Sequence, residues 1–225
     1  KYMWMTSCIS TAVLEGRDLK HAFRPQPSGQ QYGIMAMDFI AQNAKSKFGK
    51  DPKDMRVAII HEDGAYGVDV AKGNEAGAKQ TGMQMVMKEG YSTTAPDLSS
   101  LITKLKRARP DVIFHTGYNP DITLFLRQSR ELGLRFGALV GHGAGYGVYT
   151  KLKETAGNDV NYVFNIDPIS IWLTNPKALD PSLPPMVDMI GAEYMKAKPD
   201  TTIKSAHVGM AASNTYLFMS QILPR

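Results

Sequence analysis

Short apolar runs alternate with amphipathic helical segments along the middle of this chain, and this alternation limits the fold more than any other feature. The runs Arg56–His61, Val112–Phe114 and Phe136–Val140 have the length and apolar character of buried strands. Between them, apolar residues recur at steps of three and four, as on one face of a helix. This strand–helix repeat predicts an α/β fold, in which a parallel sheet has helices on both faces.

Capping and helix-breaking residues give approximate bounds for these elements. Gly49 and Gly82 each follow the end of a helix, and the pair Asn119-Pro120 begins one. Asp97 is expected to cap another helix. The expected helices cover 28–48, 66–80, 186–196 and 205–223, with two more starting after Asp97 and after Asn119, and the expected strands cover 56–61, 83–88, 112–114, 136–140 and 162–164.

The pattern changes after Asp167, where the chain becomes rich in proline. The link that follows contains Pro168, Pro176, Pro181, Pro184 and Pro185. Residues 1–52 and 167–225 lack the strands for a complete sheet of their own. We therefore interpret both segments as parts of a second lobe.

Three loops are expected at the edge of the sheet where ligands bind. In a parallel sheet with helices on both faces, this edge lies beyond the carboxyl ends of the strands. The loops are Glu62 to Tyr66, Thr116 to Asn119 and Gly141 to Tyr146. Two tyrosines lie on neighbouring loops, Tyr66 on the first and Tyr118 on the second, so we expect them to line a shared binding site.

The chemistry of these loops suits a small ligand with a polar head group. A tyrosine ring offers a flat apolar face, and its hydroxyl can form a hydrogen bond. Small-molecule sites combine apolar walls with a few polar groups in this way. The amides of Tyr66 and Gly67 lie at the start of a helix, a position that favours an anion such as a carboxylate.

Composition and residue spacing argue against nucleic-acid and metal binding. The net charge of +5 comes from 26 Lys and Arg against 21 Asp and Glu, and the basic run Lys104–Arg109 shares a helix with apolar residues, as a solvated face does. The five histidines, His21, His61, His115, His142 and His207, form no short metal-ligand pair. His61 and His115 are expected to be hydrogen-bonded at strand ends. Cys8 is the single cysteine and is expected to be a small buried hydrophobe.

The glycine-rich run "GHGAGYG", Gly141 to Gly147, does not match a nucleotide fingerprint. The sixth position counted from Gly141 is Tyr146, where the dinucleotide motif requires a small residue. Two interpretations stay open, a flexible turn and a loop whose amides approach a ligand. An enzyme is poorly supported, because the sequence has no Gly-x-Ser-x-Gly elbow and no evident acid–base pair.

Three stretches resemble a known family. "HAFRPQPSGQQYG", "MRVAIIHEDGAYGVDVAKG" and "APDLSSLITKLKRARPDVIFHTGYNPDITLFLRQSRELGL" are similar to extracellular solute-binding proteins of the branched-chain amino acid ABC transporter type. These are type I periplasmic binding proteins. The resemblance extends over nearly the whole chain and is closest from Phe23 to Gly145.

The resemblance implies two α/β lobes joined by a hinge, with a ligand held between them. Residues 1–52 would belong to lobe 1, residues 53–166 would form lobe 2, and residues 167–225 would return to lobe 1. The chain starts at Lys1 without a signal peptide, contains no apolar run of the roughly 20 residues that a membrane span needs, and is shorter than the family pattern. We therefore expect a truncated or processed chain.

The resemblance also implies a set of ligand-binding residues. Tyr66 matches the family tyrosine in the "YG" turn, and Tyr118 matches the aromatic residue of the next loop. Ser7 to Thr11 matches the segment that holds the ligand carboxylate, with Ser10 and Thr11 as its expected members. Ala65 and Asn119, next to the two tyrosines, complete this part of the expected set.

One departure from the family pattern bears on the ligand. Amino-acid binders carry a glutamate for the ligand ammonium where this chain has Gly143. A buried ammonium without an acceptor is unfavourable by a few kcal/mol. We therefore expect a small aromatic or branched carboxylate, with His142 as a donor to it, or an amino acid if Glu62 or Asp63 replaces the missing acid.

The resemblance finally implies partners and a location. The expected partners are a small-molecule ligand and the membrane permease of an ABC importer, with no nucleic acid, no metal and no cofactor. The expected location is the periplasm, or the cell exterior with a lipid anchor, and the full-length protein is expected to be a monomer. Two alternatives stay open, a ligand-sensing receptor domain of the same fold and a Rossmann-like α/β enzyme.

Overall fold

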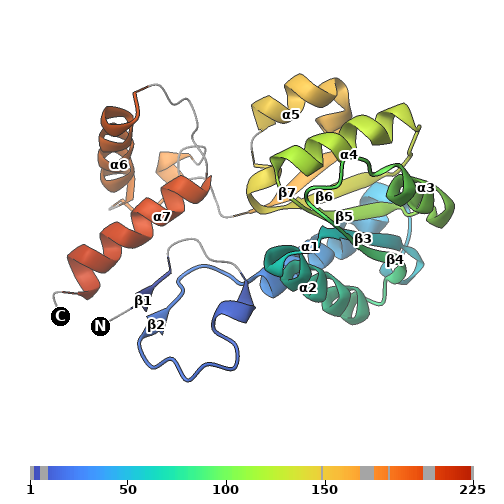
Figure 1. Cartoon of the computed structure of the whole chain (residues 1–225). Coiled ribbons are helices and arrows are strands. Elements are labelled where there is room, and N and C mark those ends of the chain that lie inside the picture. Colours follow the sequence, from blue (N-terminus) through green and yellow to red (C-terminus); the bar gives the residue numbers. More distant parts are fainter. Residues whose placement is uncertain are drawn as a thin grey trace. The chain divides into compact units, whose positions relative to one another are not determined.

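The structure is a computed structural model that describes residues 3–5, 10–147, 149–167, 175–181, 183–199 and 206–223. The chain divides into two compact units, and Figure 1 shows the elements of both. The sheet unit consists of Ile9–Glu15 and Pro27–Ile166, and the terminal unit consists of Lys1–Cys8, Gly16–Gln26 and Asp167–Arg225. The expected ligand-binding residues within the described ranges all belong to the sheet unit.

A five-stranded parallel sheet forms the centre of the sheet unit. In order across the sheet, its strands are β4 (Gln84–Tyr91), β3 (Arg56–Glu62), β5 (Val112–Thr116), β6 (Ala138–His142) and β7 (Val163–Ile166). Each neighbouring pair is parallel, with Val57 opposite Val112 and Val112 opposite Ala138. The carboxyl ends of all five strands therefore meet at one edge, called here the site edge.

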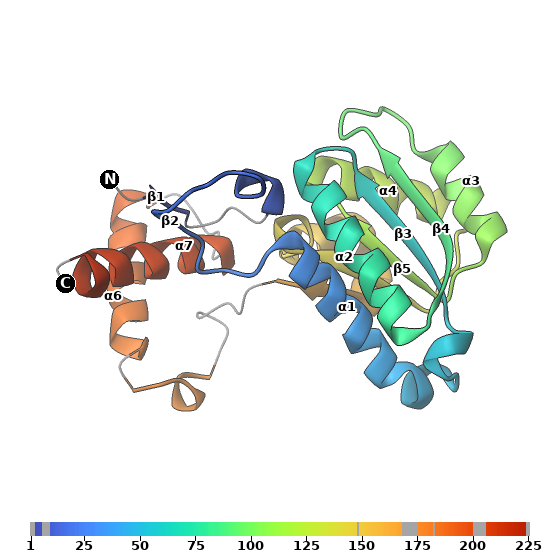
Figure 2. The ribbon, with the colours of Figure 1, turned by 90° about the horizontal axis from the view of Figure 1, so that it is seen from below.

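Helices cover both faces of this sheet (Figures 1 and 2). One face carries α1 (Gly29–Asn43) and α2 (Ala65–Thr81), and the other carries α3 (Ser99–Ala108), α4 (Asn119–Glu131) and α5 (Tyr149–Ala156). Successive strand residues point to opposite faces, so Val57 and Ile59 pack with α1 and α2, whereas Ala58 and Ile60 pack on the other side. The predicted α/β fold with two covered faces is confirmed.

Helix α1 packs within the sheet unit. Ser28 and Gln31 form a capping box, in which the Gln31 amide donates to Ser28 Oγ (3.2 Å) and the Ser28 amide donates to Gln31 Oε1 (2.7 Å). The buried face of α1 includes Met37 and Ile40, which share a core with Ala71 of α2. Residues Pro27–Ile166 thus belong to one compact unit, and the expected lobe boundaries after residues 52 and 166 stay predictions.

Short helical turns complete the sheet unit. They are η1 (Thr11–Val13), η2 (Ala44–Phe48), η3 (Pro52–Asp54), η4 (Gly143–Gly145) and η5 (Gly157–Tyr162). The turn η2 is a π-helical continuation of α1, so the expected helix over 28–48 is present with a changed last turn. Helix α5 lies between the expected loop Gly141 to Tyr146 and the expected strand 162–164, in a stretch for which no element was predicted.

In its described residues, the terminal unit contains two short strands and two helices. Strands β1 (Met3–Trp4) and β2 (Ala22–Phe23) are parallel, and η6 (Pro176–Ala178), α6 (Leu183–Ala197), α7 (Ala206–Leu217) and η7 (Phe218–Ile222) follow. The Trp4 ring stacks on Phe218 with 4.6 Å between centroids. Among the described residues, no helix has both the length and the apolar character needed to cross a bilayer. Cys8 and Ser7 lie outside the described residues.

Candidate functional site

Two tyrosines face each other at the site edge. The ring centroids of Tyr66 and Tyr118 are 5.8 Å apart, with 50° between the ring planes. Tyr66 lies in the first turn of α2, which follows β3, and Tyr118 directly precedes α4, which follows β5. Because β3 and β5 are neighbours in the sheet, the turns beyond them are adjacent. Tyr66 is half-buried and Tyr118 is 45% exposed, so the pair presents aromatic surface to solvent.

The Tyr66 hydroxyl ties the loop after β3 to the loop after β6. It donates to the backbone carbonyl of His142 at 2.8 Å. Gly143 follows with φ of +69°, and a Cβ atom at this position would collide with the Tyr66 hydroxyl oxygen. Two independent constraints, the left-handed backbone and the phenol, therefore require glycine here. While Tyr66 keeps this position, an acidic side chain cannot occupy residue 143.

The start of α2 already holds a carboxylate from the protein itself. Glu62 is 2% exposed, and its side chain turns back to accept from the amide of Gly64 (2.5 Å) and from the amide of Gly67. The expectation that the Gly67 amide binds a ligand anion is therefore wrong, because Glu62 satisfies it. For the same reason Glu62 is a poor substitute for an acid at Gly143. Asp63, which is exposed on the same loop, keeps its carboxylate at the surface.

Ser10 and Thr11 lie beside the first turns of α2. Ser10 Oγ donates to the carbonyl of Ala65 at 3.2 Å, which places two of the expected ligand residues in contact. The Thr11 amide donates to Asp69 Oδ2 at 3.0 Å, and the Thr11 hydroxyl donates to Asp69 Oδ1. Gln30 Nε2 also donates to Thr11 Oγ1 at 3.0 Å. The polar groups of Thr11 therefore bind Asp69, a buried residue that sequence reasoning missed although it is an acid on a helix of small side chains.

The His142 ring points into the protein. It is 1% exposed, with Nδ1 3.2 Å from Thr116 Oγ1 and Nε2 3.3 Å from Asn74 Nδ2. Burial lowers the pKa of His142 to about 4, so the ring is neutral at neutral pH. This placement contradicts the expected role of the ring as a donor to a ligand. Only the backbone carbonyl of His142 engages the site, through Tyr66.

A buried polar group lies behind Tyr118. His115 is fully buried, with Nε2 2.7 Å from the Tyr91 hydroxyl and Nδ1 2.5 Å from the Tyr146 hydroxyl. The Tyr91 hydroxyl donates to Asp121 Oδ2 at 2.5 Å. The expected hydrogen bonding of His115 is confirmed. Sequence reasoning missed Tyr91 and Asp121, although an acid in the first turn after Asn119-Pro120 is a capping signal.

The glycines of the loop after β6 make room for the protein's own atoms. A Cβ atom at Gly141 would collide with the ring of Tyr146, and one at Gly145 would collide with Ile122. Together with the Gly143 contact to Tyr66, these approaches explain three glycines of the run, Gly141, Gly143 and Gly145. The alternative interpretation, in which the amides of this loop approach a ligand, stays a prediction.

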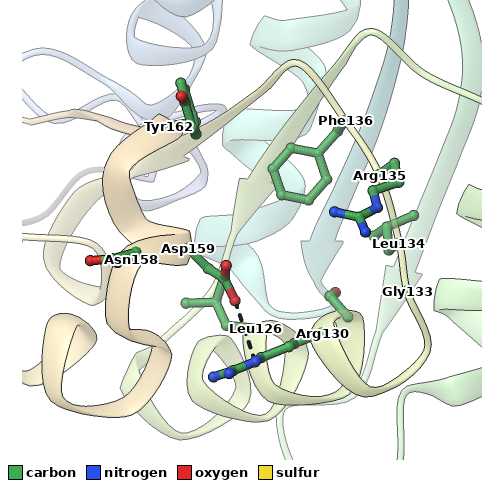
Figure 3. Close-up of a pocket in the computed structure, with 10 residues that line it drawn as sticks. Leu126, Arg130, Gly133, Leu134, Arg135, Phe136, Asn158, Asp159 and Tyr162 are labelled. Atoms are coloured by element: carbon green, nitrogen blue, oxygen red, sulfur yellow. Dashed lines mark ion pairs between the residues drawn. The ribbon is translucent and has the colours of Figure 1, made fainter.

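A cavity lies at the opposite edge of the sheet (Figure 3). It measures about 480 Å³ and is lined by residues from the end of α4, the segment that leads into β6, and η5. Arg130 pairs with Asp159 at 3.8 Å, and Phe136 and Tyr162 supply aromatic surface. Because Phe136 precedes the amino end of β6, this cavity is separate from the paired tyrosines. Among the described residues, no three His, Cys, Asp or Glu side chains could together hold a metal ion.

Comparisons with known proteins define the class. The family model for periplasmic binding proteins matches residues 15–218, and the chain belongs to this family. A curated relative, Leu/Ile/Val-binding protein homolog 8 of Brucella abortus, is 34% identical over 179 residues, which are 80% of this chain and 44% of the relative. The chain thus spans about half the length of the curated relatives it matches. The expected family is confirmed, and it is a family of binding proteins rather than enzymes.

Solved structures share the fold. A leucine-binding protein LivK of Thermotoga maritima superposes with a TM-score of 0.72 at 20% identity, over 99% of this chain and 57% of that one. A solute-binding protein of an ABC transporter from R. palustris, solved in complex with 4-hydroxybenzoate, has a TM-score of 0.53 at 17% identity, over 63% of this chain and 36% of that one. At these identities the likeness establishes the type I periplasmic binding fold and not the ligand.

Proposed function

We propose that this chain is the solute-binding part of an ABC importer and that it binds a small carboxylate at the site edge. The observation that carries this proposal is the pair of tyrosine rings, 5.8 Å apart, on the turns after β3 and β5. Two partly exposed rings in contact offer an apolar wall with hydroxyls beside it, which is the mix of groups that small-ligand sites use. Membership of the periplasmic binding protein family supports a binding role for this surface.

The ligand we propose is an aromatic or branched acid without an essential amine. Gly143 and Tyr66 exclude an acidic side chain at the position where the family pattern has a glutamate. A ligand ammonium enclosed there would lack a charged acceptor, which is unfavourable by a few kcal/mol. Asp63 is the exposed acid closest along the chain to Tyr66, and an amino acid is the alternative ligand if Asp63 supplies that acceptor.

The proposed groups for the ligand carboxylate are the Tyr118 hydroxyl and the side chains of Asn119 and Ser10. The Tyr118 hydroxyl keeps its proton, because burial and the nearby Glu62 and Asp121 raise the pKa of Tyr118. A protonated phenol donates to a carboxylate, whereas a phenolate would repel it. Asn119, half-buried at the start of α4, and Ser10, beside Ala65, are further polar members of the proposed set.

The mechanism we propose is closure of two lobes about a hinge. A ligand held between the lobes stabilises the closed form and shifts the population toward it. The closed form then docks on a membrane permease in the periplasm or at the cell exterior. A receptor domain of the same fold would use the same ligand chemistry, and the partner distinguishes the two: a permease for transport, a signalling domain for sensing.

A solution titration tests the ligand class. The 225-residue chain is titrated with 4-hydroxybenzoate, 4-methyl-2-oxopentanoate and leucine, and the dissociation constants are measured by NMR chemical-shift changes. We expect one of the two acids to bind most tightly and Tyr118→Ala to weaken it about tenfold, the factor that about 1.4 kcal/mol of aromatic contact represents. Tyr162→Ala, which removes an exposed ring at the opposite edge, is the matched control and should change nothing.

Two outcomes would overturn the proposal. Preferential binding of leucine over both acids would refute the ligand class, and it would point to Asp63 as the ammonium acceptor. An equal effect of Tyr118→Ala and Tyr162→Ala would show that the paired tyrosines are not the binding surface.

A further inference from the structure

A line of buried hydrogen bonds runs from Tyr146 to Tyr118. His115 at the end of β5 lies in its centre, 2.5 Å from the Tyr146 hydroxyl and 2.7 Å from the Tyr91 hydroxyl. Tyr91 donates to Asp121 Oδ2 at 2.5 Å, and Asp121 Oδ1 accepts from the Tyr118 amide at 3.0 Å. Each of the first four residues in this line is at most 8% exposed. The line thus connects the loop after β6, through the core, to the ligand loop.

The contacts fix the direction of every hydrogen bond in this line. The Tyr91 oxygen has one proton, which it gives to Asp121, so it must accept from His115 Nε2–H. A neutral imidazole then has a bare Nδ1, which accepts from the Tyr146 hydroxyl. Reversing the line would require a protonated Asp121, whose two oxygens both lie within 3.2 Å of the donating Tyr118 amide. The Nε2–H tautomer of His115 is therefore the one that satisfies all four groups.

Two glycines lie directly against the side chains of this line. A Cβ atom at Gly117 would lie 2.5 Å from the Tyr91 oxygen and would collide with Asp121 Oδ2. A Cβ atom at Gly141 would collide with the Tyr146 ring. The backbone of both loops thus approaches the hydrogen-bonded side chains closely. If one of these side chains moves, the tightly packed backbone around it leaves little space for its hydrogen-bonded neighbours to adjust.

We propose that His115 is a positioning residue, which, through Tyr91 and Asp121, holds the Tyr118 loop in the geometry that binds the ligand. The inference rests on the proposed function of Tyr118, but the line itself can be tested without a ligand. Asp121 is the link, because the same carboxylate accepts from Tyr91 and from the Tyr118 amide. Loss of the Tyr91 hydroxyl leaves Asp121 with fewer fixed partners and loosens its hold on Tyr118.

The first test is spectroscopic and uses the unaltered chain. Nitrogen-15 NMR of the His115 ring should show a protonated Nε2 and an unprotonated Nδ1 throughout the neutral pH range. The Nδ1–H tautomer, or a rapidly exchanging mixture of the two, would overturn the proposal. This measurement does not depend on the folding of any variant.

The second test measures hydrogen exchange of the Tyr118 amide. In Tyr91→Phe, exchange should be about ten times faster than in the parent chain, the factor that one ordinary hydrogen bond represents. In Tyr146→Phe, which cuts the far end of the line, the increase should be smaller, and Tyr162→Phe, which removes an exposed hydroxyl at the opposite edge, should cause none. Unchanged exchange in a folded Tyr91→Phe, or the same increase in Tyr162→Phe, would refute the link to Tyr118.

The third test asks whether the line affects binding. In a titration with 4-hydroxybenzoate, Tyr91→Phe should weaken binding about three- to tenfold in the parent and have no effect when Tyr118 is already alanine. Equal weakening in both backgrounds would mean that Tyr91 does not act through Tyr118. If the parent chain binds neither 4-hydroxybenzoate nor 4-methyl-2-oxopentanoate, the proposed function is refuted, whereas the tautomer and the exchange rates still decide whether the line positions Tyr118.

Discussion

Replacing Gly143 by alanine tests whether Tyr66 dictates this position. An alanine with φ near +69° lowers the free energy of unfolding by about 1 kcal/mol, because its Cβ atom strains the left-handed backbone. The same Cβ atom would collide with the Tyr66 hydroxyl oxygen, so the phenol must move and its hydrogen bond to the His142 carbonyl is lost. That bond contributes about 1 kcal/mol. We therefore expect Gly143→Ala to lower the free energy of unfolding by about 2–3 kcal/mol, roughly twice the cost of strain alone.

The chain offers a matched control for the contribution of backbone strain alone. Gly82 has φ of +75° and no atom within 4 Å of a built Cβ, so Gly82→Ala carries the strain without the collision. Urea denaturation of both variants, and of each in a Tyr66→Phe background, separates the two contributions. The extra cost of Gly143→Ala should largely disappear once the Tyr66 hydroxyl is absent. Equal costs for Gly143→Ala and Gly82→Ala in the parent chain would refute the reasoning.

Three further predictions concern stability. Burial lowers the pKa of His115 to about 3 and that of His142 to about 4, below their value near 6.5 in the unfolded chain, so the unfolded chain binds protons first on acidification. Stability should therefore fall as the pH drops below 6.5, by about 1.4 kcal/mol per pH unit for each histidine, and a flat profile of unfolding free energy between pH 6.5 and 4.5 would contradict this. Asp69→Ala removes the acceptor of two Thr11 donors, so it should lower the free energy of unfolding by about 1–3 kcal/mol and speed proteolysis near Thr11. An unchanged rate of cleavage near Thr11 would argue against the contact. Asp97→Ala removes a side-chain acceptor for the first amide of α3 and should lower the melting temperature, and an unchanged melting temperature would show that Asp97 does not cap the helix.

Most of the sheet unit could be predicted from the sequence because its elements carry strong local signals. The five expected strands are present, and the parallel order places Tyr66 and Tyr118 on adjacent turns as expected. The helix boundaries differ slightly from those expected. Helix α3 begins one residue later than Asp97 predicted, and its N-cap position is Leu98. The Asp97 carboxylate still accepts from the Ser99 amide at 2.8 Å. Helix α4 likewise starts at Asn119 rather than after it.

The direction of side chains at the strand ends could also have been predicted. Val140 packs on the face covered by α1 and α2, so His142, two residues later, must point to the same face. By the same rule His115 follows Ile113 to the face covered by α4. The expectation that His142 faces a ligand overlooked this alternation.

Other features depend on distances along the chain that local patterns do not encode. The Glu62 carboxylate folds back onto the amides at the start of α2 and occupies the place where a ligand anion was expected. The same residues are compatible with either anion, so the sequence could not distinguish the two. The pairing of Asp69 with Thr11 spans 58 positions. The apolar face of α1 predicted burial, but it could not show that α2 and the sheet would cover it.

The direct measurement of the central claim is a nuclear Overhauser experiment on the chain with 4-hydroxybenzoate. We expect magnetisation transfer from the ligand ring protons to the rings of both Tyr66 and Tyr118, and none to Tyr162 at the opposite edge. Transfer to Tyr162 alone, or to residues away from both tyrosines, would show that the paired rings do not form the binding surface.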